Sequence, residues 1–288
     1  MAISAYSIFA FTDVAIKKTT QVYDAFEVAL YMNIFTILFL IPAIFFCGGI
    51  EKTTATKTLK FHALRCFCMM VNFVCLIYAF SQLPIASVYV IVFCAPFIVN
   101  ILALLLLKEN ISAHRWLSIT LGFLGVVIAM RPGQTEIGLA IILVVIGTFT
   151  YALSIISVRF IDKNDHWLSY LIYLMAFQTP ILVGIVLYRG GTILPDLSDW
   201  QTMPWFLGAG FLYVIALSLL PAAIQRAGAS IVAGLVYIVF PWGVFYGYTI
   251  FGDVVDHWTL AGASVIVLSG ITLIYKEKQE KEDHERIG

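Results

Sequence analysis

Polar side chains that could bind a ligand lie inside long apolar stretches of this sequence. Asp13 is the acidic residue placed furthest inside such a stretch, and Asn72 and Asn100 lie in two others. A carboxylate in hydrocarbon is costly, so it indicates contact with a substrate, an ion or a basic partner. Lys17 follows Asp13 by one helical turn, and an ion pair between them is the alternative. For the asparagines, the alternative is a hydrogen bond to a neighbouring helix.

Aromatic and polar residues share one face of the stretch 84–108. Tyr89, Phe93, Pro96 and Asn100 are spaced i, i+4, i+7 and i+11, which places them on one side of a helix. Pro96 would lie in the middle of that helix, where its ring frees a carbonyl group that lipid cannot satisfy. We therefore expect this face to point into protein or water.

A similar stretch, 227–253, carries Tyr237, Pro241 and Trp242, and its two aromatic side chains offer flat surfaces with a polar edge. Tyr151 shares a helical face with a serine one turn later, and Gln178 lies just before a proline inside an apolar run. We predict that residues of this kind line a substrate path. They are Asp13, Asn72, Tyr89, Phe93, Asn100, Tyr151, Gln178, Tyr237 and Trp242.

Motifs of catalytic and metal sites are absent from the sequence. It contains no HExxH zinc motif, no G-x-S-x-G nucleophile turn and no glycine-rich phosphate loop. The five cysteines all lie in apolar runs, which is typical of small buried residues rather than of metal ligands. We therefore expect no enzymatic activity, no metal and no cofactor, and an enzyme embedded in the membrane is disfavoured.

The composition indicates an all-α protein that crosses a membrane many times. The chain of 288 residues is 61% hydrophobic and 12% charged, with a formal net charge of zero. Its mean hydropathy is +0.95. A water-soluble domain could not bury so much apolar surface. The balanced and scattered charge offers no basic patch for nucleic acid.

Ten apolar stretches follow one another, separated by short polar segments. A helix needs about 20 residues to cross a hydrocarbon layer of ~30 Å, and most of these stretches are that long. The expected membrane-spanning helices are Ala2–Ile16, Ala25–Cys47, Phe61–Gln82, Pro84–Lys108, Trp116–Met130, Ile137–Ile161, Trp167–Tyr188, Met203–Ile224, Ala229–Phe251 and Trp258–Tyr275.

The distribution of positive charge predicts the orientation of these helices. With the N-terminus in the cytoplasm, 13 of the 17 Lys and Arg residues belong to cytoplasmic segments. Cytoplasmic loops of membrane proteins are enriched in Lys and Arg, so this orientation is favoured over its reverse. Both chain termini are therefore expected on the cytoplasmic side.

The two halves of the sequence resemble each other. When Pro96 is aligned with Pro241, Lys108 comes near Gly252 at the end of the stretch. Because each half has five spans, an odd number, the second copy must enter the membrane inverted, and such repeats bind substrate near the bilayer midplane. We predict one repeat at 1–133, an inverted repeat at 134–275 and a charged cytoplasmic tail at 276–288 that is solvated or frayed.

Several segments carry a resemblance to a known family. FAFTDVAIKK (9–18), KFHALRCFCMM (60–70) and the stretch 83–133 are similar to the drug/metabolite transporter superfamily, as is 227–253 in the second half. The sequence resembles EamA-type carriers with two repeats of five helices. Within that family it is most similar in appearance to the branch that contains S-adenosylmethionine transporters. It implies a multi-pass carrier of small organic metabolites in a bacterial inner membrane.

Together these observations predict a secondary transporter that works by alternating access. Its substrate would be a small amino-acid-like or nucleoside-containing metabolite, with S-adenosylmethionine as a candidate. Its partners would be that metabolite and the lipid bilayer, and the protein would be a monomer or a homodimer. An exporter of amino acids or drug-like compounds is one alternative. A membrane interaction protein without transport activity, which needs no polar face in mid-membrane, is the other.

Overall fold

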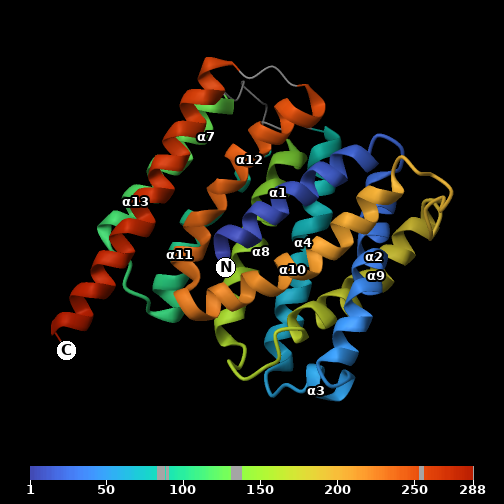
Figure 1. Cartoon of the computed structure of the whole chain (residues 1–288), viewed down its shortest axis with the longest axis horizontal. Coiled ribbons are helices and arrows are strands. Elements are labelled where there is room, and N and C mark those ends of the chain that lie inside the picture. Colours follow the sequence, from blue (N-terminus) through green and yellow to red (C-terminus); the bar gives the residue numbers. More distant parts are fainter. Residues whose placement is uncertain (83–87, 89–90, 131–137, 253–255, 288) are drawn as a thin grey trace.

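The protein is a bundle of helices, shown in Figure 1. The computed structural model describes residues 1–82, 88, 91–130, 138–252 and 256–287, and within these ranges all regular structure is helical. In the described part of the chain, seven helices are long and apolar enough to cross a membrane, and two apolar helices are shorter. The expected all-α, multi-span architecture is confirmed, whereas the number of ten spans stays a prediction.

Most helix bounds follow the predicted stretches closely; the exceptions are 84–108 and 229–251, which are interrupted, and the longer last helix. The first half consists of α1 (Ala2–Thr19), α2 (Ala25–Phe46), α3 (Ile50–Thr54), α4 (Leu59–Gln82), α6 (Ala95–Leu102), the π-helix η1 (Ala103–Leu107) and α7 (Ala113–Met130). The short helix α3 was not predicted. It lies in the loop between the second and third spans.

The second half begins with α8 (Leu139–Ser157), the 3-10 helix η2 (Val158–Phe160), α9 (Ser169–Tyr188) and α10 (Met203–Ala227). It continues through α11 (Ala229–Gly234), the 3-10 helix η3 (Leu235–Ile238), α12 (Val239–Tyr246), the π-helix η4 (Gly247–Phe251) and α13 (His257–Ile287). Because α13 runs on to Ile287, the tail that we expected to be solvated or frayed is helical.

The helix predicted over 84–108 is not continuous. The chain turns at Phe93 and Cys94, and α6 begins at Ala95, so Pro96 lies in the first turn of that helix. A proline costs little there, since the first N–H groups of a helix have no intrahelical partner. The expectation of a mid-helix proline was therefore wrong, and Phe93 does not share a continuous helix with Asn100. Tyr89 lies outside the described residues.

The second proline-containing stretch is broken in the same manner. The 3-10 helix η3 interrupts it, and Pro241 lies in the first turn of α12. Both stretches then end in a π-helix followed by a residue in the left-handed conformation, Lys108 with φ 53° and Gly252 with φ 69°. The same succession of local features thus occurs once in each half.

Helix packing also has the same pattern in both halves. In the predicted repeat, α1, α4 and α6 correspond to α8, α10 and α12. Helix α4 packs against α8, and their counterparts α10 and α1 also pack against each other. Likewise α6 packs against α8, and their counterparts α12 and α1 pack against each other. The pairs α2–α9 and α7–α13 join one half to the other at opposite edges of the bundle (Figure 1). This pattern supports the predicted repeat, whereas its inversion and the cytoplasmic position of both termini stay predictions.

Helices α7 and α13 approach each other at small residues. A Cβ atom added to Gly262 would lie 2.4 Å from the carbonyl oxygen of Gly125 and 2.5 Å from the Cβ of Ala129. Small residues let two helix backbones come close enough for dispersion contacts, which hold helices together where lipid removes the hydrophobic driving force.

We predict that Gly262→Ala lowers the thermal stability of the purified protein. The added methyl group meets backbone atoms, and overpacking of this kind costs about 1–3 kcal/mol. The control is Gly270→Ala in the same helix, since a Cβ there meets no atom within 4 Å. Unfolding in detergent, followed by fluorescence, compares the two. Equal melting temperatures would show that the close approach does not stabilise the bundle.

Candidate functional site

A small cavity lies where helices of both halves meet. Its volume is about 10 Å³. Its walls are formed by Tyr6 of α1, Ala95, Pro96 and Val99 of α6, Tyr151 and Ile155 of α8, and Ala233 and Val236 of α11 and η3. Pockets for drug-sized ligands measure about 300–1,000 Å³. In this conformation the cavity therefore has room for about one water molecule and not for a metabolite.

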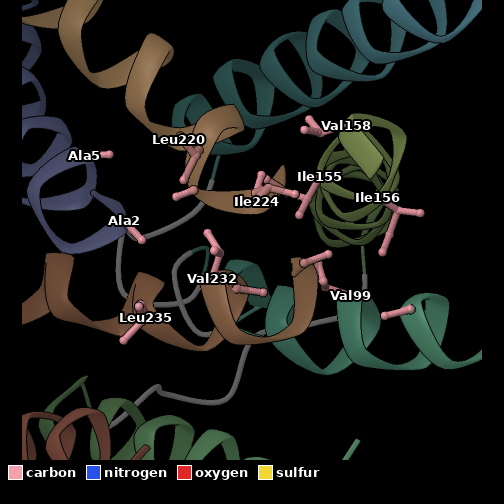
Figure 2. Packing of buried hydrophobic residues seen from close by; sticks show 14 of the residues in the cluster. Ala2, Ala5, Val99, Ile155, Ile156, Val158, Leu220, Ile224, Val232 and Leu235 are labelled. Atoms are coloured by element: carbon pink, nitrogen blue, oxygen red, sulfur yellow. The ribbon is translucent and has the colours of Figure 1, made fainter. Parts of the chain in front are cut away.

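Buried apolar side chains from several helices of both halves pack together next to the cavity (Figure 2). We call this cluster the apolar plug. It consists of Ala2 and Ala5 of α1, Val99 of α6, Ile155 of α8, Leu220 and Ile224 of α10, and Val232 and Leu235 at α11 and η3. Val99 and Ile155 also line the cavity, so the plug forms one of its walls.

Polar contacts tie the helix ends together beside the plug. Arg159 Nε lies 3.3 Å from Glu109 Oε1, and Arg159 Nη1 donates to the carbonyl oxygen of Gln225 at 3.0 Å. The Gln225 side-chain amide donates in turn to the carbonyl oxygen of Val158 at 2.5 Å. These contacts join η2, the end of α10 and the segment after η1, and so hold this side of the bundle closed.

Tyrosine side chains lie in the cavity wall and near it. The hydroxyl groups of Tyr6 and Tyr151 lie close enough to interact with each other. Tyr213 of α10 makes an edge-to-face contact with Phe9, with ring centroids 5.7 Å apart. The rings come from α1, α8 and α10, so aromatic surface with polar ends surrounds the meeting point of the two halves.

Arg65 brings a buried positive charge to this region. Its side chain is 5% exposed, and Nη1 donates to the carbonyl oxygen of Tyr170 at 3.0 Å. The guanidinium carbon lies 5.7 Å from the centroid of the Tyr170 ring. The hydroxyl groups of Tyr151 and Tyr213 are within electrostatic range. Among the described residues, no carboxylate forms an ion pair with Arg65.

Asp13 carries a negative charge on α1, which packs against α10, whereas Arg65 belongs to α4, which packs against α8. It lies on the same face of α1 as Tyr6 and Phe9, since the three are spaced i, i+3 and i+7. Its neighbours Thr12 and Val14 are buried, but the Asp13 side chain is exposed although protein atoms surround it. Asp13 is therefore accessible, and it lies further along α1 from the plug than Tyr6 does.

The carboxylate of Asp13 has no hydrogen bond or ion pair within the described ranges. The Lys17 ammonium group lies 3.9 Å from the centroid of the Phe251 ring. The ion pair between Asp13 and Lys17, which the sequence left open as an alternative, is not formed. Both Asp13 and Arg65 interact electrostatically with the Tyr213 hydroxyl group, which thus lies within range of both charges.

The asparagines hold helices together. Asn72 Nδ2 donates to the carbonyl oxygen of Gly147 at 3.0 Å and joins α4 to α8. Asn100 is fully buried, and its Oδ1 accepts a hydrogen bond from Ser230 Oγ, which joins α6 to α11. The Asn100 Nδ2 has no hydrogen-bond partner among the described residues.

The remaining predicted residues lie apart from the cavity wall. The Tyr237 hydroxyl group donates to the carbonyl oxygen of Phe93 at 2.9 Å, and both side chains are buried. Trp242 stacks on Tyr246 with ring centroids 5.7 Å apart. Gln178 is buried in α9. Of the predicted residues that the structure describes, Tyr151 lies in the cavity wall, and Asp13 lies near the cavity.

Three residues of this region were not among the predicted lining residues: Tyr6, Arg65 and Tyr213. The spacing of Tyr6 from Asp13 could have indicated a shared face. A short internal repeat is a second signal, because Phe-Thr-Asp at 11–13 in α1 corresponds to Phe-Thr-Tyr at 149–151 in α8. It places Asp13 and Tyr151 at equivalent positions of the two halves. No feature of the sequence around Tyr213 indicates that this residue lies near the cavity.

Known proteins share sequence and fold with this chain. Residues 1–131 match the EamA-like transporter family. An S-adenosylmethionine uptake transporter of Rickettsia felis is 27% identical over 274 residues, which cover 93% of this chain and 88% of the relative. A riboflavin transporter of Vibrio cholerae is 28% identical over 246 residues, covering 83% and 78%.

A solved crystal structure that is 10% identical covers 96% of both chains with a TM-score of 0.80, which shows a shared fold. The relatives are membrane transporters by their names, and they come from bacteria. The resemblance to EamA-type carriers that the sequence suggested is thereby confirmed.

We predict that Ser230→Ala destabilises the protein by about 1–3 kcal/mol, because it leaves the buried Oδ1 of Asn100 without its donor. The control is Ser264→Ala, whose exposed hydroxyl group bonds only to Leu260 within its own helix. Thermal unfolding in detergent without ligand measures both variants. If Ser230→Ala unfolds like the control, the bond between α6 and α11 contributes no stability.

Proposed function

Because the chain belongs to the drug/metabolite transporter superfamily, we propose that it is a secondary transporter that works by alternating access. Its substrate would be a small amino-acid-like or nucleoside-containing metabolite, and S-adenosylmethionine is the first candidate. The proposed setting is a bacterial inner membrane, with ten spans in two inverted repeats, both termini in the cytoplasm, and a monomer or homodimer as the active form.

The observation that carries this proposal is the position of the cavity. Its walls come from α1 and α6 of the first half and from α8 and α11 of the second. Polar groups beside it, above all Asp13, lack a partner within the described part of the protein. Inverted-repeat transporters bind substrate between the halves, where irregular helix segments line a cavity. The turn before α6 and the 3-10 helix after α11 are such segments.

The two sides of the cavity differ, which fits one state of a transport cycle. Along one face of α1 the side chains change from buried Tyr6 through half-buried Phe9 to exposed Asp13. The apolar plug and the contact between Arg159 and Glu109 close the other side. With a cytoplasmic N-terminus, the plug is the cytoplasmic gate and this conformation is open outward. Transport requires a second conformation in which the plug separates and the Asp13 side closes.

The relatives guide the choice of substrate. Their names give S-adenosylmethionine and riboflavin, and both compounds carry a fused heterocycle. Tyr6, Tyr151 and Tyr213 provide aromatic surface with hydroxyl groups, which suits such a ring system. The nine residues predicted from the sequence remain proposed lining residues, and Tyr6, Arg65 and Tyr213 are added to them. The alternative is that the protein exports amino acids or drug-like compounds.

We predict that S-adenosylmethionine stabilises the detergent-purified protein and exchanges across reconstituted vesicles. A ligand at 100 times its Kd adds about 2.7 kcal/mol of apparent stability. Tyr151→Phe removes one hydroxyl group from the cavity and should weaken the effect about 5-fold to 10-fold, the worth of one hydrogen bond. Tyr248→Phe, at an exposed position of η4, is the control.

Nucleosides, riboflavin and aromatic and basic amino acids complete the ligand panel for this measurement. A saturable shift with one class of compound, together with counterflow of the same compound, identifies the substrate. Absence of both for every compound would refute the transporter proposal and favour an interaction protein.

We predict that the plug opens during transport. A cysteine at Val232, in a protein whose five natural cysteines have been replaced, should react slowly with a maleimide applied from the cytoplasmic side, because this position is 1% exposed. Addition of substrate should accelerate the reaction. A cysteine at Lys163, in an exposed loop, should react rapidly with and without substrate. An unchanged rate at position 232 during active counterflow would exclude the plug as a gate.

A further inference from the structure

We propose that Arg65 and Asp13 bind the two ends of a zwitterionic substrate, with the carboxylate at Arg65 and the cationic group at Asp13. This assignment rests on the proposed function and names the chemical class of its substrate. It makes the amino-acid part of the ligand, rather than its ring system, the feature that the site selects.

The surroundings of Arg65 suit an anion that the protein itself does not supply. A guanidinium group is charged at every physiological pH and has five N–H donors in a planar fork. Among the described residues, the guanidinium group donates one hydrogen bond, to the carbonyl oxygen of Tyr170, and lies over the face of the Tyr170 ring. A buried charge is normally paired, because desolvation without a partner is costly. A substrate carboxylate would complete the site and match the fork with two parallel hydrogen bonds.

Asp13 presents the opposite charge. Its carboxylate accepts no hydrogen bond from the described residues, and its side chain is exposed. The aromatic rings of Phe9 and Tyr213 lie on the same side of α1. A carboxylate bordered by aromatic rings attracts a cation through its charge and through the negative faces of the rings. An ammonium or sulfonium group fits this description.

The two charges are held apart rather than paired with each other. Asp13 belongs to α1 and Arg65 to α4, and the hydroxyl group of Tyr213, on α10, is within electrostatic range of both. No ion pair joins them in the structure as described. A direct ion pair would satisfy both charges and leave nothing for a ligand. Separation keeps each charge available, so a molecule with one carboxylate and one cationic group can reach both.

This arrangement discriminates between the compounds named for the relatives. S-Adenosylmethionine carries a carboxylate, an ammonium group and a sulfonium group, whereas riboflavin carries neither a carboxylate nor an ammonium group. A site with two charged groups excludes an uncharged ligand that leaves both of them desolvated and unpaired. The geometry therefore favours the S-adenosylmethionine type of substrate for this chain.

The test combines protein variants with ligands that differ by one charged group. Proteoliposomes containing the full chain are loaded with S-adenosylmethionine, and inhibition of counterflow is measured for S-adenosylmethionine and for its decarboxylated analogue. The wild-type protein should bind the analogue about tenfold or more weakly, the worth of a hydrogen bond to a charged group. Arg65→Gln should weaken the binding of S-adenosylmethionine by a similar factor and leave the binding of the analogue unchanged.

Asp13→Asn gives a different expected pattern. Both ligands keep their cationic groups, so this variant should weaken the binding of both ligands by about the same factor. Arg226→Gln and Asp196→Asn are the matched controls, because their side chains are exposed at the end of α10 and in the loop before it. Both controls should bind both ligands as the wild-type protein does. If Arg65→Gln is too unstable to reconstitute, Arg65→Lys keeps the charge without the planar fork and should show the same preference with a smaller ratio.

The outcomes separate this assignment from the proposed function. Equal weakening of both ligands by Arg65→Gln would make Arg65 a structural residue and overturn the assignment, while transport of S-adenosylmethionine would still stand. Transport of riboflavin alone would also overturn the assignment and leave a transporter of another specificity. Absence of counterflow with every compound in the wild-type protein would refute the proposed function, and the assignment would fall with it.

Discussion

A polar group inside a hydrocarbon layer must find its partner within the protein, and this constraint organises the whole bundle. Asn72 meets it by bonding to α8, and Asn100 by bonding to Ser230 of α11. The two broken helices meet it as well, since α6 packs between α8 and α11, where protein surrounds the turn that precedes it. Irregular backbone is thus found beside the cavity, which explains why the same segments that interrupt helices also shape the candidate site.

The same constraint gives meaning to the difference between paired and unpaired charges. Arg159 and Glu109 lie close to each other at one end of the bundle, and the carbonyl oxygen of Gln225 accepts from the same guanidinium group. These charges satisfy each other and stabilise a closed surface. Arg65, which is buried, and Asp13, which is exposed, have no such partner among the described residues. Since an unpaired charge lowers stability, its presence next to a cavity indicates a ligand, whereas a paired one indicates structure.

The sequence predicted the helices well because the length of an apolar run reflects the thickness of a membrane, and that signal is local. It failed at Pro96, since an apolar run that continues past a turn does not show where the turn lies. It predicted Asp13 as a site residue from its cost in lipid. It could not predict that Arg65 would meet Tyr170, or that Tyr6 would meet Tyr151, because such contacts join residues more than 100 positions apart. Spacing along one helix carries no information about the helix opposite.

The helix pairing suggests how binding could be coupled to movement. Asp13 and Tyr213 belong to the packed pair α1 and α10, and Arg65 and Tyr151 belong to the pair α4 and α8, which correspond to each other in the predicted repeat. A substrate that contacts Asp13 and Arg65 links the two pairs across the cavity. Its binding energy then favours conformations in which the pairs approach each other, and an empty site gains nothing from them. Two separated charges on two movable pairs would thus make the conformational change depend on the substrate, which is the property that distinguishes a carrier from a channel.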